Sequence, residues 1–360
     1  MYSVLLWKDG MIEIGLIGFG LAGKFFHAQV ILAIPGLRLA AILQRGGDEA
    51  ATMYSGVHIV RSLDELLAIE SIRLIVIATP NQTHFSFAKR CLEAGRDVVV
   101  DKPFTNTAAD AVELFRIARQ HGRLLTVFHS RRFDADFQGL RGLLALGELG
   151  RLVRFEEHYD RYRPTGKVGA WRELPGPGSG ILFDLAPHLI DHALMLFGRP
   201  QALSADVRKE RDDAATDDAF DLSLEYPGNL RAQLSATMLS LTPRPRFLVL
   251  GTKGSFMKRE FDPLENALRN AQVPTEDGWL MEREENWGEL TVVENGANVR
   301  RPVASRGDWR DFYANVRDAL LGKAELLVTP QQVLDVMVAL ELAQESNAAR
   351  RVVPWRNVEL

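Results

Sequence analysis

Two polar clusters in this sequence could carry out acid–base and charge-stabilising chemistry. Lys102 follows a short apolar stretch and precedes a proline. A lysine at the carboxyl end of a strand can donate to a substrate hydroxyl and stabilise a developing alkoxide. In the second cluster, Asp184 lies one helical turn before His188. A carboxylate so placed can fix the tautomer of the imidazole and raise its basicity, which suits a general base near neutral pH.

Both clusters have other interpretations. His188 and His192 could bind a metal, but the sequence offers no evident third ligand, so we expect no metal site. The histidines could also be partly buried structural residues, and Lys102 an ordinary surface lysine. Pro187 is tolerated in the first turn of a helix, which predicts that Asp184 lies near a helix start.

A glycine-rich turn offers a place for a dinucleotide cofactor. The apolar stretch 12–17 runs into the spacing G-x-G-x-x-G, and a helical segment, 24–34, follows. The first glycine permits a tight turn, the second lets the backbone approach a pyrophosphate, and the third lets the helix pack closely. A plain strand–helix turn is the alternative, but the strand before and the helix after favour nucleotide binding. The residues expected to contact the cofactor here are Gly18, Phe19, Gly20, Leu21, Ala22 and Gly23.

The second strand favours NADP(H), with NAD(H) as the alternative. NAD sites place an acidic residue near the end of this strand, whereas NADP sites favour a basic one. Here Leu43 is followed by Gln44 and Arg45, and the guanidinium fork of arginine matches a phosphate. Arg45 could instead be a solvated loop residue, and Asp48 could reach the ribose if the loop folds back. The other residues expected on the cofactor are Gln44, Arg45, Thr79, Pro80, Asn81, His84, Asp101 and Lys102.

The first third of the chain predicts a parallel sheet. Short, almost wholly apolar segments alternate with stretches whose apolar residues recur at helical spacing. The expected strands are 12–17, 37–43, 74–78, 97–100 and 124–128, and further helices are expected at 62–69, 84–94 and 108–121. Such strands are covered on both faces, and ligands bind outside their carboxyl ends, where the polar clusters fall.

The pattern changes after about Phe133. Apolar and polar residues alternate in 220–226 and 230–238, and the pair Asn295-Gly296 is typical of a hairpin turn. Helices are expected at 180–196 and 330–346. We therefore predict two domains. Residues 1–130 form a dinucleotide-binding domain, and residues 131–360 form an α+β domain with an open, largely antiparallel sheet.

Composition limits the class of protein. The chain has 360 residues, of which 46% are hydrophobic and 25% charged, as in ordinary globular proteins. A net charge of −4 gives no attraction to nucleic acid or an anionic membrane, and no apolar run reaches the roughly 20 residues of a membrane span. The first ten residues lack the features of a signal peptide, and Cys91 stands alone, so no internal disulfide forms. We expect a cytoplasmic protein without a nucleic-acid or membrane partner.

Jointly, the motifs resemble the glucose–fructose oxidoreductase/inositol dehydrogenase (Gfo/Idh/MocA) family over nearly the whole chain. Besides the glycine turn, the shared stretches are Ala78–His84, Asp101–Pro103 and Gly180–Asp191. The segments 20–28, 128–133 and 160–164 further resemble a subgroup that contains NADP-dependent scyllo-inositol dehydrogenases. Asp101 replaces the usual glutamate of the family, which is expected to shift a contact to the nicotinamide ribose.

The resemblance implies α/β architecture, with an N-terminal Rossmann doubly wound parallel sheet and a C-terminal domain that often forms oligomers. We therefore expect a homodimer or homotetramer. It also implies Lys102, Asp184 and His188 as the catalytic set of an NAD(P)-dependent dehydrogenase or reductase.

The expected reaction is reversible hydride transfer between the nicotinamide and a secondary alcohol or ketone of a sugar or cyclitol. His188 would act as general base, Asp184 would orient the imidazole, and Lys102 would stabilise the alkoxide. The residues of the second domain expected to bind the polyol are Arg131, Arg132, Tyr162, Arg163, Trp171 and Arg172.

Two other functions fit the same fold. A nucleotide-sensing regulatory protein would keep the fold without turnover, but such a protein is expected to lose Lys102 or His188, and both are present. A reductase of an imine or tetrapyrrole is the other alternative, and the intact Lys/Asp/His set favours a hydroxyl or carbonyl substrate over it.

Overall fold

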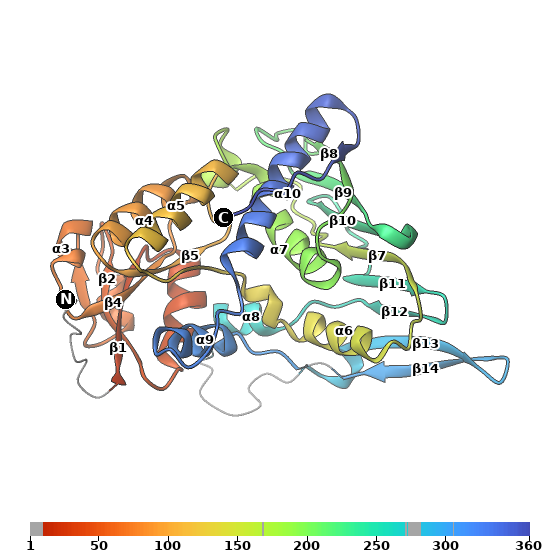
Figure 1. The fold of residues 1–360 in the computed structure, drawn as a ribbon, viewed down its shortest axis with the longest axis horizontal. Helices are drawn as coiled ribbons and strands as arrows, with labels where there is room; N and C mark the ends of the chain where they lie inside the picture. The colour runs from red at the N-terminus through yellow and green to blue at the C-terminus, as the bar shows by residue number, and fades with distance from the viewer. Residues whose placement is uncertain (1–9, 168, 271, 273–281, 305) are drawn as a thin grey trace.

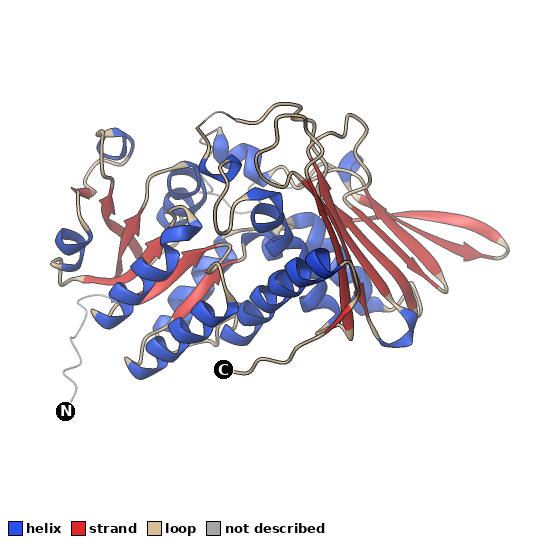
Figure 2. Ribbon diagram, turned by 90° about the horizontal axis from the view of Figure 1, so that it is seen from above, coloured by secondary structure: helices blue, strands red, loops and turns tan. Residues whose placement is uncertain are grey.

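Two sheets with helices between them form the protein in the computed structural model (Figure 1 and Figure 2). The structure describes residues 10–167, 169–270, 272, 282–304 and 306–360. The first sheet belongs to the N-terminal part of the chain and the second to the C-terminal part.

The first sheet has six parallel strands. From edge to edge they are β3 (His58–Val60), β2 (Leu37–Leu43), β1 (Ile12–Ile17), β4 (Ile72–Ile77), β5 (Asp97–Asp101) and β6 (Leu125–Phe128). Successive residues of β4 and β5 are buried, which requires cover on both faces of the sheet. The intervening helices are α2 (Glu49–Met53), α3 (Leu63–Leu67), α4 (His84–Glu93) and α5 (Ala108–Gln120). The predicted doubly wound parallel sheet is therefore confirmed, with β3 as an additional strand too short to show a pattern.

The helical segment after β1 begins two residues earlier than its sequence pattern indicates. It starts as a π-helical stretch, η2 (Ala22–Ala28), and continues as α1 (Gln29–Leu32). The buried His27 of η2 places Nδ1 2.6 Å from the hydroxyl oxygen of Tyr313, which lies on α9 (Arg310–Leu320). The C-terminal part of the chain therefore returns to pack against the first domain, across the predicted boundary at residue 130.

The second sheet has nine strands and is mostly antiparallel. In order they are β14 (Ala297–Val303), β13 (Gly288–Glu294), β12 (Gly254–Lys258), β11 (Phe247–Gly251), β7 (Leu152–His158), β10 (Arg231–Thr237), β9 (Ala219–Glu225), β8 (Ala202–Arg208) and β15 (Val353–Pro354). Only the β7–β10 pair is parallel among these neighbours. Asn295 and Gly296 have positive φ at the β13–β14 turn, as the hairpin prediction requires.

Two long helices connect the sheets. α7 (Gly180–Phe197) packs on β9 and β10, and α10 (Pro330–Ala349) packs on α7 and β8 and also contacts α5 of the first domain. By length and composition α7 could cross a membrane, but 67% of the helix is buried inside the folded protein. Its apolar character is therefore that of a core helix. Between these elements lie α6 (Ala135–Leu146) and α8 (Leu264–Arg269).

Candidate functional site

A crevice of about 970 Å³ lies at the carboxyl ends of the first-sheet strands and is closed on the other side by the second domain. Among the predicted site residues it is lined by Gly18, Phe19, Gly20, Leu21, Ala22, Gln44, Arg45, Thr79, Pro80, Asp101, Lys102, Arg131, Arg163, Trp171, Arg172, Asp184 and His188. The predicted site residues outside its lining are Gly23, Asn81, His84, Arg132 and Tyr162. Residues from both domains therefore meet in one cavity, large enough for a cofactor and a small molecule.

The glycine turn at one end of the crevice fits a dinucleotide. Gly18 has φ +96°, and a Cβ there would lie 2.6 Å from the carbonyl oxygen of Ala78. A Cβ on Gly23 would lie 2.0 Å from the carbonyl oxygen of Gly18, so this glycine lets the helix pack on the turn and does not itself face the crevice. A Cβ on Gly20 would meet nothing within 4 Å. The turn thus presents open backbone where a pyrophosphate binds in this kind of fold.

The loop after β2 presents a cation to the same end of the crevice. Arg45 is exposed and lines the cavity. Asp48 instead pairs with Arg61 at 2.5 Å. Arg61 also donates to the carbonyl oxygens of Gln44 and Gly47 at 2.8 and 2.7 Å, so it fixes the course of the loop. The acid that could have bound the ribose is therefore engaged elsewhere, and the guanidinium of Arg45 fits a phosphate there.

Lys102 joins the first domain to α7. Its Nζ lies 2.5 Å from the backbone oxygen of Asp184 and 3.1 Å from Oδ1 of the same residue. Arg172 contacts the same carboxylate oxygen, with Nε 3.1 Å from Oδ1. Burial would raise the pKa of Asp184, but the charges of Lys102 and Arg172 outweigh it and hold this pKa well below its usual value. The carboxylate is therefore ionised and shared by two cations.

His188 is neutral in this setting. The side chain is buried, and burial together with the positive charges of Lys102 and Arg131 lowers the pKa of His188 well below its usual value. Among the described residues, Nδ1 of His188 has no hydrogen-bond partner. The hydrogen bond that Asp184 was expected to accept from this ring is thus not formed, because the carboxylate is engaged by Lys102 and Arg172.

The start of α7 is built by residues that the sequence pattern only partly indicated. Gly180 has φ +85°, and a Cβ there would lie 2.1 Å from Oδ1 of Asp217. Asp217 accepts the backbone N–H of Leu182 at 2.7 Å and so satisfies the helix end. Pro187 lies well inside α7, beyond the first turn where it was expected. A proline there leaves the carbonyl of Phe183 without its helical donor, and Lys102 binds the adjoining carbonyl of Asp184.

Asp101 supports the lysine from the strand side. Its Oδ1 accepts the backbone N–H of Lys102 at 2.8 Å, and its Oδ2 lies 3.9 Å from Nε2 of His27. Burial would raise the pKa of Asp101, but His27 and Lys102 bring it below its usual value. The residue lines the crevice, and its contact to the nicotinamide ribose stays a prediction.

Three residues that the sequence predicts to bind a ligand lie outside the lining of the crevice. The amide of Asn81 donates to the carbonyl oxygen of Gly178 at 2.8 Å and so ties the two domains together. His84 is buried, with Nδ1 2.9 Å from the oxygen of Pro103 and Nε2 2.9 Å from that of Thr79. Tyr162 is 50% exposed. Asn81 and His84 thus have scaffold contacts in this structure, and the ligand contacts expected of these three residues stay predictions.

Other predicted polar residues belong to buried ion pairs. Arg132 holds Asp191 through two bonds of 2.6 and 2.7 Å. His192 lies 2.9 Å from Glu157 and stacks on Phe137 at 3.8 Å, so it does not join His188 in a metal site. In the ranges that the structure describes, no group of three His, Cys, Asp or Glu side chains is arranged for a metal ion.

Several crevice residues were missed from the sequence. The segment after β7 contributes Tyr159 and Arg161, and Trp309 lines the wall beside them. Tyr159, Arg161 and Arg163 follow a period of two, which is the signal of an extended segment with one face toward a ligand. That period would have selected Arg161 and excluded Tyr162.

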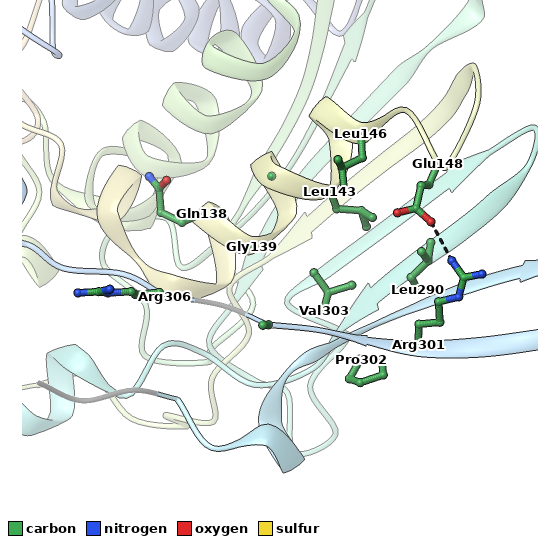
Figure 3. Close-up of a pocket in the computed structure, with 12 residues that line it drawn as sticks. Gln138, Gly139, Leu143, Leu146, Glu148, Leu290, Arg301, Pro302, Val303 and Arg306 are labelled. Carbon is green, nitrogen blue, oxygen red and sulfur yellow. Dashed lines mark hydrogen bonds and ion pairs between the residues drawn. The ribbon is translucent and has the colours of Figure 1, made fainter. Parts of the chain in front are cut away.

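A second, shallower groove of about 490 Å³ lies between α6 and the β13–β14 hairpin (Figure 3). Leu143 and Leu146 of α6 face Leu290 and Val303 across it (Figure 3). Its lining contains none of the predicted site residues, and the chemistry is therefore placed in the larger crevice.

Comparison with protein families matches both parts of the chain. Residues 12–129 match the oxidoreductase family with an NAD-binding Rossmann fold, and residues 137–257 match the GFO/IDH/MocA C-terminal domain.

Individual relatives cover almost the whole chain. The uncharacterised oxidoreductase YdgJ of Escherichia coli is 43% identical over 93% of this chain and 96% of its own length. The scyllo-inositol 2-dehydrogenase (NADP(+)) IolW of Bacillus subtilis is 32% identical, with 96% of each chain covered. The structure of the oxidoreductase yvaA of Bacillus subtilis superposes with a TM-score of 0.92 at 32% identity, covering 96% of this chain and 99% of that one.

Proposed function

The chain belongs to the Gfo/Idh/MocA family of NAD(P)-dependent oxidoreductases, and we propose that it transfers hydride reversibly between the nicotinamide and a secondary alcohol or ketone of a sugar or cyclitol. One observation carries the proposal: Lys102 of the first domain and His188 of the second line a single crevice beside the glycine turn. The inositol dehydrogenase among the relatives supports a cyclitol or a similar polyol.

Lys102 is suited to bind the reacting oxygen. Its ammonium has three N–H donors, and two of its contacts go to the backbone oxygen and carboxylate of Asp184. The third donor has no further hydrogen bond among the residues that the structure describes, so it could bind a substrate oxygen. The positive charge, held by these bonds, would stabilise that oxygen as it becomes an alkoxide.

His188 is suited to take the hydroxyl proton. Because its pKa is lowered, the imidazole is unprotonated at neutral pH and can accept a proton. In the reverse direction the protonated ring would return it to the carbonyl oxygen. A nicotinamide, when bound, supplies the hydride acceptor or donor, and the residues of this chain supply the orientation, the charge and the proton path.

We further propose a preference for NADP(H). The guanidinium of Arg45 lines the crevice beside the glycine turn, while Asp48 is paired with Arg61. This arrangement favours the 2′-phosphate over the free hydroxyls of NAD. The name of the relative IolW supports the same cofactor.

The test is a cofactor-reduction screen of inositols, aldoses and deoxy-sugars with both nucleotides, run on the native chain and on His188→Ala and Lys102→Ala. We expect reduction of NADP(+) by at least one polyol and a loss of kcat of about 100-fold or more in each variant, with the cofactor still bound. Lys89→Ala is the matched control, because Lys89 lies on α4 and pairs with Glu93 at the surface. Near-normal turnover in either site variant would contradict the assigned roles.

A further inference from the structure

The segment after β7 directs alternate side chains into the crevice. The backbone N–H groups of Tyr159, Arg161 and Arg163 donate to β10 and the residue after it at 2.7–2.9 Å, so the segment is extended and fixed. Successive side chains of such a segment point to opposite sides. Tyr159, Arg161 and Arg163 line the crevice, whereas Asp160 is buried against Arg244.

The two arginines of this segment feel the charge of Asp184, and Arg161 also that of Glu265, without a close ion pair to any carboxylate of the described residues. Arg161 stacks over the ring of Tyr159 at 4.6 Å and donates to its hydroxyl at 3.2 Å. Within the described ranges, neither Arg161 nor Arg163 forms an ion pair with a carboxylate. Burial, and after it the charges of Arg161 and Arg269, lower the pKa of Arg163 in spite of the opposing charge of Asp184.

Four carboxylates of the crevice wall are already paired with other cations, and a further one, Asp217, accepts the backbone N–H of Leu182 at 2.7 Å. The pairs are Asp184 with Lys102 and Arg172, Glu265 with Arg131 and Arg269, and both Glu173 and Asp218 with Arg211. Positive charge therefore remains on the second-domain side of the crevice. A neutral polyol would leave this charge uncompensated when it excludes water from the cavity.

We propose that the substrate carries an anionic group, a carboxylate or a phosphate, which Arg161 and Arg163 bind while the hydroxyl to be oxidised reaches Lys102 and His188. The inference rests on the proposed function, because it specifies the substrate class of the same crevice. The planar fork of arginine matches either oxyanion with two parallel hydrogen bonds. The cation assigned to the cofactor, Arg45, belongs to the first domain and is separate from this pair.

The test compares neutral and anionic members of matched series: glucose, glucuronate and glucose 6-phosphate, and myo-inositol with an inositol monophosphate. The initial rate of NADP(+) reduction is measured for the native chain, Arg161→Gln and Arg163→Gln. Arg154→Gln is the control, because Arg154 lies on β7 but is exposed and pairs with Glu156. We expect an anionic member to be preferred at least about tenfold in kcat/KM, and each crevice variant to remove that preference by raising KM about 10- to 100-fold. The carboxylate and phosphate arms identify which oxyanion is bound.

A binding arm makes the result independent of turnover. Glucuronate, glucose 6-phosphate and inorganic phosphate are titrated calorimetrically into the protein saturated with NADPH. Anion binding that Arg163→Gln weakens and Arg154→Gln leaves intact supports the site, even if hydride transfer to sugars fails. Three results would overturn the anion site: equal rates with neutral and anionic members, equal losses for both in the variants, or no anion binding. None of them would contradict the proposed oxidation of polyols. A weaker NADPH affinity in Arg163→Gln would also overturn it, because the pair would then serve the cofactor.

Discussion

Replacing Asp184 with asparagine distinguishes two roles that its place in the sequence cannot separate. The helical spacing suggests that the carboxylate orients His188, whereas the structure pairs it with Lys102 and Arg172 at 3.1 Å each. If the carboxylate serves the lysine, Asp184→Asn acts on the position of Lys102. If it orients the imidazole, the substitution acts on His188.

The expected size follows from the surroundings of the carboxylate. At 3.1 Å each pair has a gross Coulomb energy of about 5 kcal/mol at an effective dielectric constant near 20, much of which desolvation offsets. The Arg172 side chain is 45% exposed, and Lys102 keeps its bond to the backbone oxygen of residue 184. We therefore expect Asp184→Asn to lower the free energy of unfolding by about 3 kcal/mol, at the lower end for breaking a buried pair. A lysine displaced by about 1 Å should lower kcat about 100-fold.

Two double-mutant cycles, measured by kcat and by urea unfolding, show whether Asp184 is coupled to Lys102 or to His188. One combines Asp184→Asn with Lys102→Met and the other combines it with His188→Gln. We expect Asp184→Asn to add little once Lys102 is gone, and to add its full effect to His188→Gln. The reverse pattern would refute this interpretation: the effects of Asp184→Asn and Lys102→Met on kcat would add fully, and those of Asp184→Asn and His188→Gln would not. The carboxylate would then orient the imidazole.

Three further predictions concern the cofactor end and a buried carboxylate. Arg45→Ala should raise the Kd of NADPH about 10- to 100-fold and leave that of NADH unchanged in fluorescence titrations; equal losses would contradict the phosphate contact. Gly23→Ala, whose Cβ would lie 2.0 Å from the oxygen of Gly18, should destabilise the cofactor-free protein by about 1–3 kcal/mol in urea, whereas Gly20→Ala, with open space around its Cβ, should not. Burial, with Asp134 and Asp136, raises the pKa of Asp262 to about 8. The folded state therefore holds a proton that the unfolded chain releases. As the pH rises from about 4 to about 8, the free energy of unfolding should fall by up to about 1.4 kcal/mol per pH unit. Urea unfolding at several pH values should show a shallower slope in Asp262→Asn, and an unchanged slope would exclude this group.

The elements of the first domain were predictable because their sequence signals are local. An apolar strand followed by G-x-G-x-x-G constrains the backbone within a dozen residues, and Gly18 and Gly23 adopt the roles that the spacing assigns. The same holds for the Asn295-Gly296 turn, since a two-residue hairpin needs positive φ at both positions. In each case the determining interactions lie close together in the chain.

Side-chain direction at the strand ends was less predictable, because it depends on partners distant in sequence. Asn81 and His84 have the polar character of ligand-binding residues, yet Asn81 contacts the carbonyl oxygen of Gly178, and His84 that of Pro103 besides the nearby Thr79. Nothing in the stretch 78–84 indicates those acceptors. The strand-end rule therefore locates the crevice but does not decide which polar groups face it.

Charge pairing was beyond local prediction for the same reason, and it determines the chemistry. Lys102 and Asp184 are 82 residues apart, so only the contact of α7 with the residue that follows β5 shows that the carboxylate serves the lysine. Once Asp184 and the other paired wall acids are assigned to their cations, Arg161 and Arg163 are left without a close ion pair among the described residues. The uncompensated charge of the crevice thus follows from the three-dimensional pairing and not from composition. The net charge of the whole chain, −4, indicates no preference for an anionic ligand, although its crevice has one side that is locally cationic.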